Sequence, residues 1–282
     1  MNFTRQKSII ANHINREERL NKTTLIAALV IAAVTLIAGC SAPTTDKSSP
    51  KTASKEPDLT LQVASLNLSG FNKRFEKNEI SKFSRLLKKE QVDVLSVQNI
   101  TRYPGVESRV DFVNELVARS EMRYSFGEMV NSSGRQSGNG IFSLFPMRNT
   151  HNDAFDGVRS ATFEAALQAS VDGGVKDVIV VSTTLPPKAP ESDQSECLHA
   201  ITSKSVALPG QPMIVTGNLP SSVDIKEKSS YVEVAESAKK ENEKDPHTRI
   251  WFSKEGSLKL LGTRTVETEF GPMVIAQFGL FR

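Results

Sequence analysis

The sequence predicts an α/β domain in which two sheets pack together and helices flank them. Short β-branched runs such as Val92–Val97 and Val178–Val181 are typical of buried strands. Apolar residues recur at helical spacing in segments 80–87 and 112–117. Strands, helices and further strands follow one another along the chain, and this order indicates two packed sheets with helices on their outer faces.

The individual elements follow from local patterns. The first strand is predicted at 59–66, where apolar and polar residues alternate before an apolar run. A third helix is predicted over Ser195–Leu208. Further strands are predicted at 92–97, 141–145, 161–171, 178–181, 212–217, 258–266 and 273–281. Gly134–Gly140 lacks the Gly-Lys-Ser/Thr of a phosphate-binding loop, so it is interpreted as the turn into the strand at 141–145.

One charged segment allows two interpretations. Val223–His247 is rich in Lys, Glu and Ser and has few large apolar residues. Glu236 and Lys240 stand at i,i+4 spacing, which favours an exposed helix, and a mobile loop is the alternative. A solvated face is the simpler expectation for this segment, and a partner-binding surface is the other.

The N-terminal segment has the pattern of a secretory signal. Residues 1–23 are polar and basic, residues 24–38 are almost wholly apolar, and small residues precede Cys40. The apolar run is shorter than the roughly 20 residues that span a bilayer. Residues 37–40 resemble the bacterial lipoprotein box. The resemblance implies cleavage after residue 39 and palmitate-type acyl chains on Cys40, and an uncleaved anchor is the alternative.

The same resemblance predicts a location. A lipidated Cys40 would hold the protein at the bacterial cell envelope. Ser41 follows the cysteine, which implies the outer membrane, facing the periplasm, if the cell has one. Residues 40–57 contain no large apolar side chain, so they are predicted to form a flexible tether. Residues 58–282 are long enough for one domain.

Charge and cysteine content narrow the functional classes. Residues 1–39 hold five of the 35 basic and two of the 32 acidic residues, which leaves 30 of each in the remaining chain. Equal numbers of acidic and basic residues argue against a large nucleic-acid-binding surface. Affinity for nucleic acid comes mainly from basic side chains that neutralise phosphates. After Cys40 only Cys197 remains, so no intrachain disulfide can form. Cys197 is predicted to be a small buried residue on a helix.

Four strand ends carry a family resemblance. They are Val63-Ala64-Ser65-Leu66-Asn67, Val94-Leu95-Ser96-Val97-Gln98-Asn99, Val180-Val181-Ser182-Thr183-Thr184-Leu185 and Ile214-Val215-Thr216-Gly217-Asn218. Their order and spacing resemble the endonuclease/exonuclease/phosphatase superfamily, the DNase-I-like metal-dependent phosphodiesterases. The resemblance implies a four-layer α/β sandwich of two mainly antiparallel sheets flanked by helices. In that family three of these strand ends carry Gln-Glu, Thr-His-Leu and Gly-Asp-x-Asn.

The chain departs from the family at the residues that carry the chemistry. Asn67 matches a family Asn, but Asn99 stands where a metal-binding Glu is expected. Thr184 replaces a phosphate-contacting His, and Asn218 replaces an Asp. Pro220 replaces the Asn that follows, which removes a hydrogen-bond donor.

The C-terminal motif departs in the same way. Thr268-Glu269-Phe270-Gly271-Pro272 resembles the family's Ser-Asp-His-x-Pro, with Glu269 for the Asp and Phe270 for the His. Phenylalanine cannot accept a proton. Arg159 precedes a strand, as an arginine does in the family, and is a candidate anion-binding residue.

These substitutions imply a vestigial cleft. Asn67, Asn99, Thr184, Asn218 and Glu269 are expected at one mouth of the sandwich, with Phe270 and Arg159 beside them. Mg²⁺ in such sites relies on carboxylates, and hydrolysis also needs a base. We therefore predict no catalytic residue, no metal ligand and no cofactor.

Three functions remain open from the sequence. The leading hypothesis is a membrane-anchored, catalytically inactive binding or interaction module. Its partner would be an envelope protein or a small neutral or weakly anionic ligand, and nucleic acid is not an expected partner. The alternative is a divergent Mg²⁺-dependent phosphodiesterase, phosphatase or nuclease whose ligands have moved to Glu269, Asp153 or His151, near Asp156. The third is a purely structural lipoprotein.

Overall fold

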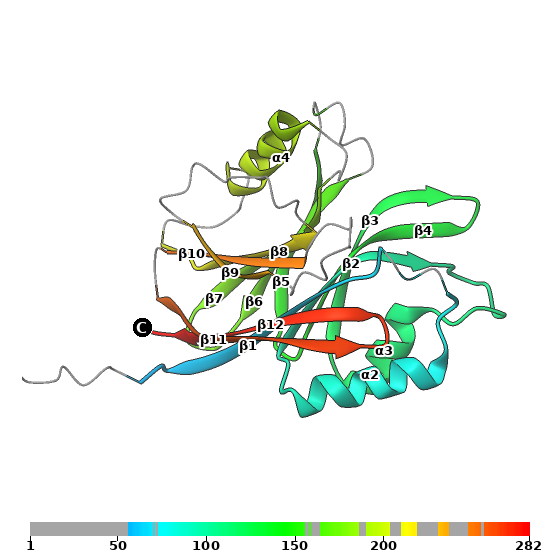
Figure 1. The fold of residues 1–282 in the computed structure, drawn as a ribbon, viewed down its shortest axis with the longest axis horizontal. Helices are drawn as coiled ribbons and strands as arrows, with labels where there is room; N and C mark the ends of the chain where they lie inside the picture. Colours follow the sequence, from blue (N-terminus) through cyan, green and yellow to red (C-terminus); the bar gives the residue numbers. More distant parts are fainter. Residues whose placement is uncertain are drawn as a thin grey trace, which may run out of the picture. The chain divides into compact units, whose positions relative to one another are not determined.

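The computed structural model describes residues 56–69, 71, 73–155, 158, 164–185, 190–203, 210–218, 231–236, 248–254 and 257–282. Within these residues the strands form two six-stranded sheets, and Figure 1 shows how helices lie outside them. These elements belong to a compact unit that spans Lys55–Arg282.

The first sheet has the strand order β11-β12-β1-β2-β4-β3. Its strands are β1 (Leu59–Asn67), β2 (Val94–Arg102), β3 (Arg123–Ser132), β4 (Arg135–Ser143), β11 (Leu258–Thr268) and β12 (Gly271–Leu280). Neighbours run antiparallel except β1 and β2, which are parallel and pair from Val63–Val94 to Asn67–Gln98. Because parallel strands end at the same edge, this register brings Asn67 next to the end of β2.

The second sheet has the order β5-β6-β7-β8-β10-β9. Its strands are β5 (Met147–Ala154), β6 (Ala165–Asp172), β7 (Asp177–Thr184), β8 (Met213–Asn218), β9 (Tyr231–Glu236) and β10 (Thr248–Ser253). Here β7 and β8 are the parallel pair, and Thr184 is in register with Asn218. The second sheet thus also brings two strand ends together.

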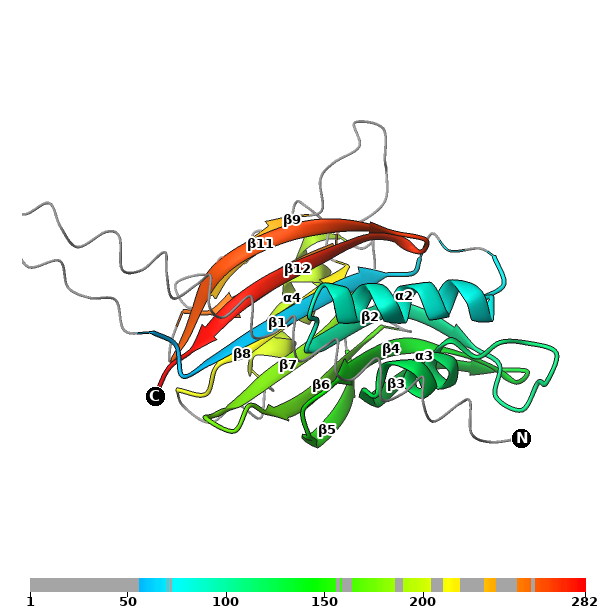
Figure 2. The same cartoon turned by 90° about the horizontal axis from the view of Figure 1, so that it is seen from below.

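Three apolar layers separate four layers of secondary structure. Helices α2 (Lys77–Lys89) and α3 (Phe112–Ser120) cover the first sheet through a core that includes Phe83 and Leu116. A second core, with Val63 and Val180, lies between the sheets. Helix α4 (Glu191–Ser203) packs on the second sheet in a third core. Figure 2 shows α2 and α3 on their side of the first sheet, and the predicted sandwich is confirmed.

Helices α2 and α3 form where the sequence predicted them, whereas α4 begins at Glu191, before the predicted start at Ser195, and residues 204–208 of that prediction lie outside the described residues. In α2 the buried residues Ile80, Phe83 and Leu87 fall on one face. Asp111 caps the N-terminus of helix α3, and its side chain accepts a hydrogen bond from the backbone N–H of Asn114 at 3.0 Å. Cys197 is fully buried on α4, as predicted. None of the helices in the described ranges is long and apolar enough to cross a bilayer.

Three polar segments differ from their prediction. Segment 147–154, for which no strand was predicted, is the edge strand β5, and segment 231–236, predicted as helix or loop, is the edge strand β9. Segment 123–132 was not predicted and forms the edge strand β3. An edge strand is held by backbone hydrogen bonds on one side, so it tolerates a polar sequence without apolar alternation.

The glycine-rich segment is mostly strand rather than turn. The chain turns at Ser133 and Gly134, both with positive φ, and β4 begins at Arg135. At Gly138 a Cβ atom would lie 2.0 Å from the Gly127 carbonyl oxygen. Only glycine permits this close approach of β3 and β4.

Candidate functional site

A pair of asparagine side chains occupies the edge where β1 and β2 end. The pairing of β2 with β4 is irregular between Val97 and Ile100, and Asn99 in this bulge has a φ of 59°. Asn99 Nδ2 donates to Asn67 Oδ1 at 2.9 Å, and the Ser69 backbone N–H donates to the same oxygen at 2.9 Å. The side-chain oxygen Oδ1 of Asn67 therefore already accepts two hydrogen bonds.

A third asparagine joins this pair to the second sheet. Asn139 on β4 is fully buried, and its Oδ1 accepts from Thr184 Oγ1 at 3.0 Å and from the Asn99 backbone N–H at 3.4 Å. Its Nδ2 donates to the carbonyls of Ala165 at 3.1 Å and Ser182 at 3.4 Å. We call Asn67, Asn99, Asn139 and Thr184 the amide floor, because these neutral groups link the two sheets at one end of the sandwich.

A second neutral network lies beside the amide floor. Gln98 is fully buried, and its Nε2 donates to Ser96 Oγ at 2.8 Å and Ser182 Oγ at 3.3 Å. Thr216 Oγ1 donates to Ser96 Oγ at 2.6 Å or to the Val181 carbonyl at 2.7 Å. The polar contacts between the sheets here are thus made by uncharged amides and hydroxyls, which satisfy one another.

The structure brings several of the predicted cleft residues together. Asn67, Asn99 and Thr184 belong to the amide floor. Asn218 ends β8 in register with Thr184, so its backbone lies at the same end of the sandwich. The side chain of Asn218, together with Arg159 and Cys40, lies outside the described residues.

Glu269 and Phe270 lie at the same end of the first sheet as Asn67, because β12 runs antiparallel to β1 and Leu66 pairs with Met273, but their contacts are with residues outside the amide floor. They form the turn between β11 and β12, where Glu269 Oε1 pairs with Lys82 Nζ of α2 at 3.0 Å. Phe270 is 4% exposed and packs among Phe71, Phe75, Phe83 and Phe112. The phenyl ring gains stability by packing against these rings, two of which, Phe71 and Phe75, belong to segments beside Asn67.

The acidic and histidine candidates for relocated metal ligands do not form one cluster among the described residues. His151 is exposed on β5, in register with Gln168, and Asp153 accepts from Gln168 Nε2 at 3.1 Å. Glu269 belongs to the other sheet, and Asp156 lies outside the described residues. Among the residues that the structure describes, no three His, Cys, Asp or Glu side chains are grouped so that they could hold a metal ion.

Raised pKa values occur away from the amide floor. Burial raises the pKa of Asp93, which precedes β2 and so lies at the opposite end of that strand from Asn99. Burial, with smaller contributions from Glu164, Asp193 and Glu196, raises the pKa of the Cys197 thiol to about 12. Groups with perturbed pKa values often mark functional sites, but Asp93 and Cys197 lie away from the amide floor. A thiol with such a pKa stays protonated and is a poor nucleophile.

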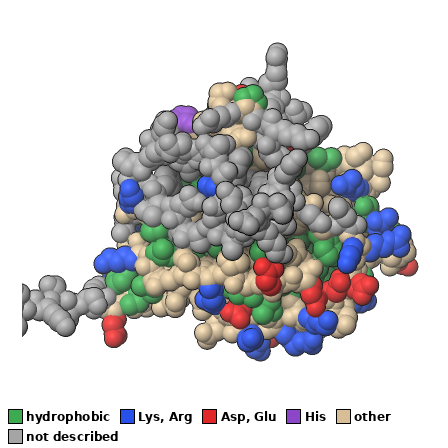
Figure 3. Space-filling model, in the orientation of Figure 1, with side chains coloured by type: hydrophobic (Ala, Val, Ile, Leu, Met, Phe, Trp, Pro, Cys, Tyr) green, Lys and Arg blue, Asp and Glu red, His purple; other side chains and the backbone are tan. Residues whose placement is uncertain are grey.

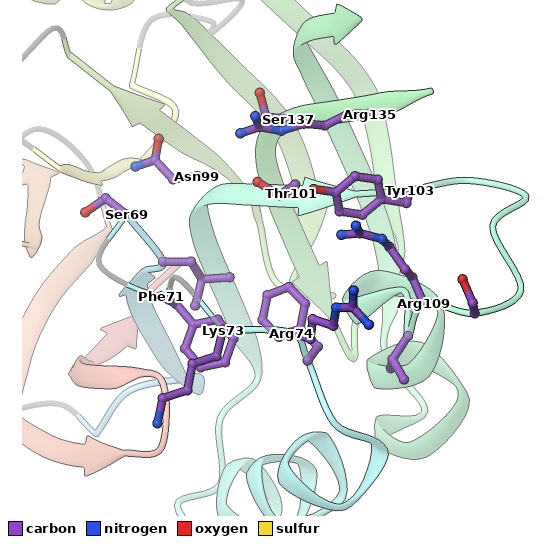
Figure 4. Close-up of a pocket in the computed structure, with 14 residues that line it drawn as sticks. Ser69, Phe71, Lys73, Arg74, Asn99, Thr101, Tyr103, Arg109, Arg135 and Ser137 are labelled. Carbon is purple, nitrogen blue, oxygen red and sulfur yellow. The ribbon is translucent and has the colours of Figure 1, made fainter. Parts of the chain in front are cut away.

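A basic pocket that the sequence did not reveal adjoins Asn99. It has a volume of about 650 Å³ and is lined by the segment after β1, the end of β2, the loop before α3 and the start of β4. Figure 4 shows four cationic side chains around it, namely Lys73, Arg74, Arg109 and Arg135. The Lys73-Arg74 pair was the only local signal, because the tertiary structure brings the other two cations from distant segments.

Comparisons with known proteins define the fold. No family model matches the sequence, and no curated protein matches it by sequence. Among solved structures, an endonuclease/exonuclease/phosphatase from Beutenbergia cavernae has a TM-score of 0.61 at 14% identity, over 79% of this chain and 72% of that chain. One from Bacteroides vulgatus has a TM-score of 0.60 at 10% identity, over 79% and 99%. D. rerio TDP2 complexed with a single-stranded DNA product has a TM-score of 0.61 at 12% identity, over 79% and 100%.

Proposed function

We propose that this chain, which has the endonuclease/exonuclease/phosphatase fold, is a membrane-tethered binding module that does not hydrolyse phosphoesters. The observation that carries the proposal is the amide floor, in which neutral side chains occupy the strand ends and bond to one another. The activities named for the structural neighbours belong to those proteins, because function depends on the site rather than on the fold.

The magnesium ion used by the resembled family does not fit these residues. Mg²⁺ is bound through one or two carboxylates that compensate its charge, and Asn67 and Asn99 are uncharged. Asn67 Oδ1 also accepts two hydrogen bonds already, so an ion would have to break them. Asn67 and Asn99 thus do not offer the negative charge that such a site requires.

The resemblance to the family also leaves this chain without the histidine that would act as general base. Phe270 stands at the position that resembles a catalytic histidine, and its ring is buried in an apolar cluster. General acid–base catalysis typically contributes about 10²–10⁴-fold to a rate. Loss of the charge stabilisation by a metal adds several kcal/mol to the barrier. Together these losses favour binding over turnover.

The decisive experiment measures metal binding and hydrolysis together. The purified protein is melted with and without millimolar Mg²⁺ or Mn²⁺ and is incubated with a chromogenic phosphodiester. A ligand present at 100 times its Kd stabilises the folded state by about 2.7 kcal/mol, which a melt would detect. We expect no metal-dependent shift and no turnover.

The control variant carries Asn99→Glu with Asn218→Asp, and it should gain a metal-dependent shift because two carboxylates then stand at neighbouring strand ends. Phe270 is left unchanged in this control, since a histidine there would enter an apolar core. If the unmodified protein melts higher with Mg²⁺ and hydrolyses the substrate in a chelator-sensitive way, it is a divergent hydrolase.

The tether and its location form a separate part of the proposal. Cys40 lies outside the described residues, and support comes from the signal-like segment and the small residues that precede it. Lipidation there would place the domain at the cell envelope. Phase partitioning should move the protein into detergent, whereas Cys40→Ala should remain aqueous. Cys197→Ala is the matched control and should behave like the unmodified protein; equal partitioning of all three into water contradicts lipidation.

A further inference from the structure

The basic pocket gathers four cationic side chains and has no acidic residue in its described lining. Its lining includes Lys73, Arg74, Arg109 and Arg135, and no Asp or Glu is among the lining residues. Figure 3 shows basic side chains on the side of the molecule that carries the β3–β4 hairpin. Such a cluster stands out in a chain whose acidic and basic residues are nearly balanced.

Several arginines elsewhere in the described structure have acidic partners. Arg102 pairs with Asp111 at 2.9 Å, Arg148 with Asp172 at 2.7 Å, and Arg264 with Glu90 at 3.0 Å. In the described part of the chain, none of the four pocket cations forms such an ion pair. Four like charges around one cavity repel one another, so an anion that enters it would relieve this repulsion.

The pocket also supplies geometry suited to oxyanions. Arg109 Cζ lies 4.0 Å from the centroid of the Tyr103 ring, a cation–π contact that orients its guanidinium group. A guanidinium group binds phosphate or carboxylate through two parallel hydrogen bonds. Figure 4 shows hydroxyl donors in the same lining, from Thr101, Tyr103 and Ser137.

We propose that the basic pocket binds a small polyanion that carries at least two phosphate or carboxylate groups, and that it does so without a metal ion. The inference rests on the proposed function, in which the domain binds rather than hydrolyses. The volume of about 650 Å³ lies within the usual range for small-molecule sites, about 300–1,000 Å³. Four cations exceed the charge of a single oxyanion, which is why the ligand needs two such groups.

A small ligand fits these observations better than a nucleic acid. The cations converge on one cavity from three segments, namely the residues before α2, the loop before α3 and the start of β4. A polymer would instead need positive charge that extends along its backbone. The ligand is nevertheless more strongly anionic than the neutral or weakly anionic one expected from the sequence.

The test measures polyanion binding in the presence of a chelator. The full chain, purified in a nonionic detergent, is titrated with tripolyphosphate, citrate, orthophosphate and glucose at low ionic strength. We expect tripolyphosphate or citrate to bind, orthophosphate to bind at least tenfold more weakly, and glucose not to bind. Added salt should weaken the binding, because the contacts are charged.

Matched variants locate the site. Arg74→Gln, Arg109→Gln and Arg135→Gln together remove three charges from the pocket and should weaken tripolyphosphate or citrate at least tenfold, which is about 1.4 kcal/mol. Arg85→Gln, Lys88→Gln and Lys89→Gln remove the same charge from exposed positions of α2 and should change affinity less than twofold. Arg135→Gln alone is the milder variant should the triple variant fold poorly.

The outcomes separate this inference from the proposed function. No binding of either polyanion, or an equal loss in the α2 control, overturns the pocket assignment. Tight binding of a single-stranded oligonucleotide that tripolyphosphate does not displace overturns the small-molecule assignment. Binding that requires Mg²⁺, or hydrolysis of a chromogenic phosphodiester, would instead contradict the proposed function. Absence of both metal response and polyanion binding leaves the proposed function intact and removes only this inference.

Discussion

The amide floor and the aromatic cluster (Phe71, Phe75, Phe83, Phe112 and Phe270) are two regions of uncharged side chains that are held together in different ways. In both regions a neutral residue stands where the resembled family has a charged or titratable one. Asn99 remains at the strand end and bonds to Asn67 and Asn139. Phe270, in the turn between β11 and β12, is instead buried against Phe83 of α2 and Phe112 of α3.

The difference shows how side-chain chemistry determines where a replaced residue lies. A half-buried amide must keep hydrogen-bond partners, and the neighbouring amides at the strand ends provide them. An aromatic ring needs no such partners and gains free energy by packing against other rings. The polar residue Asn99 is therefore held by hydrogen bonds, whereas the apolar residue Phe270 is held by packing against other rings.

The largest expected effect is in the aromatic cluster. Phe270→Ala should lower the free energy of unfolding by about 3–5 kcal/mol, because it leaves a cavity among buried rings. Urea denaturation measures the change. Leu144→Ala, at an exposed apolar position, is the control and should have little effect. A loss below about 1 kcal/mol for Phe270→Ala would show that the ring is not part of the core.

The central residue of the amide floor should come next. Asn139→Ala leaves the Asn99 N–H, the Thr184 hydroxyl and two backbone carbonyls without their partner. We expect a loss of about 2–4 kcal/mol, since buried unsatisfied groups are costly. Thermal or urea unfolding gives the value, and Asn131→Ala on the exposed part of β3 is the matched control. Equal small losses in both variants would argue against a bridging role for Asn139.

Asn99 allows a finer test of the same network. Asn99→Ala should destabilise the protein by about 1–2 kcal/mol, because it loses the bond to Asn67 and places alanine at a φ of 59°. Asn99→Gly loses the same bond but tolerates the positive φ, so its loss should be smaller. If glycine proves as damaging as alanine, the backbone conformation contributes nothing to the difference.

The smallest expected effect is at Glu269. Its ion pair with Lys82 is solvent-exposed, so Glu269→Gln should change stability by no more than about 0.5 kcal/mol and less at high salt. A double-mutant cycle with Lys82→Gln measures the coupling. Neither variant should alter tripolyphosphate binding, because both residues lie outside the basic pocket. A large change in that affinity would place Glu269 in the cleft after all.

The sequence alone predicted the elements whose signals are local. The strands β1, β2 and β7 contain mainly apolar runs that are buried on both faces, and the helices α2 and α3 have buried faces with a helical period. Such patterns are visible without the fold. The neutral character of Asn99 and Thr184 was equally visible, because it depends only on residue identity and position at a strand end.

Only the tertiary structure determined the rest, because the stabilising partners are distant in sequence. The edge strands β5 and β9 depend on pairing with β6 and β10, and their polar sequences show no buried face. Asn139 links the sheets through hydrogen bonds with Thr184 and Ala165, and Phe270 is buried by rings on other segments. The four cations of the basic pocket are scattered over residues 73–135, and the chain must fold before their charges share one cavity.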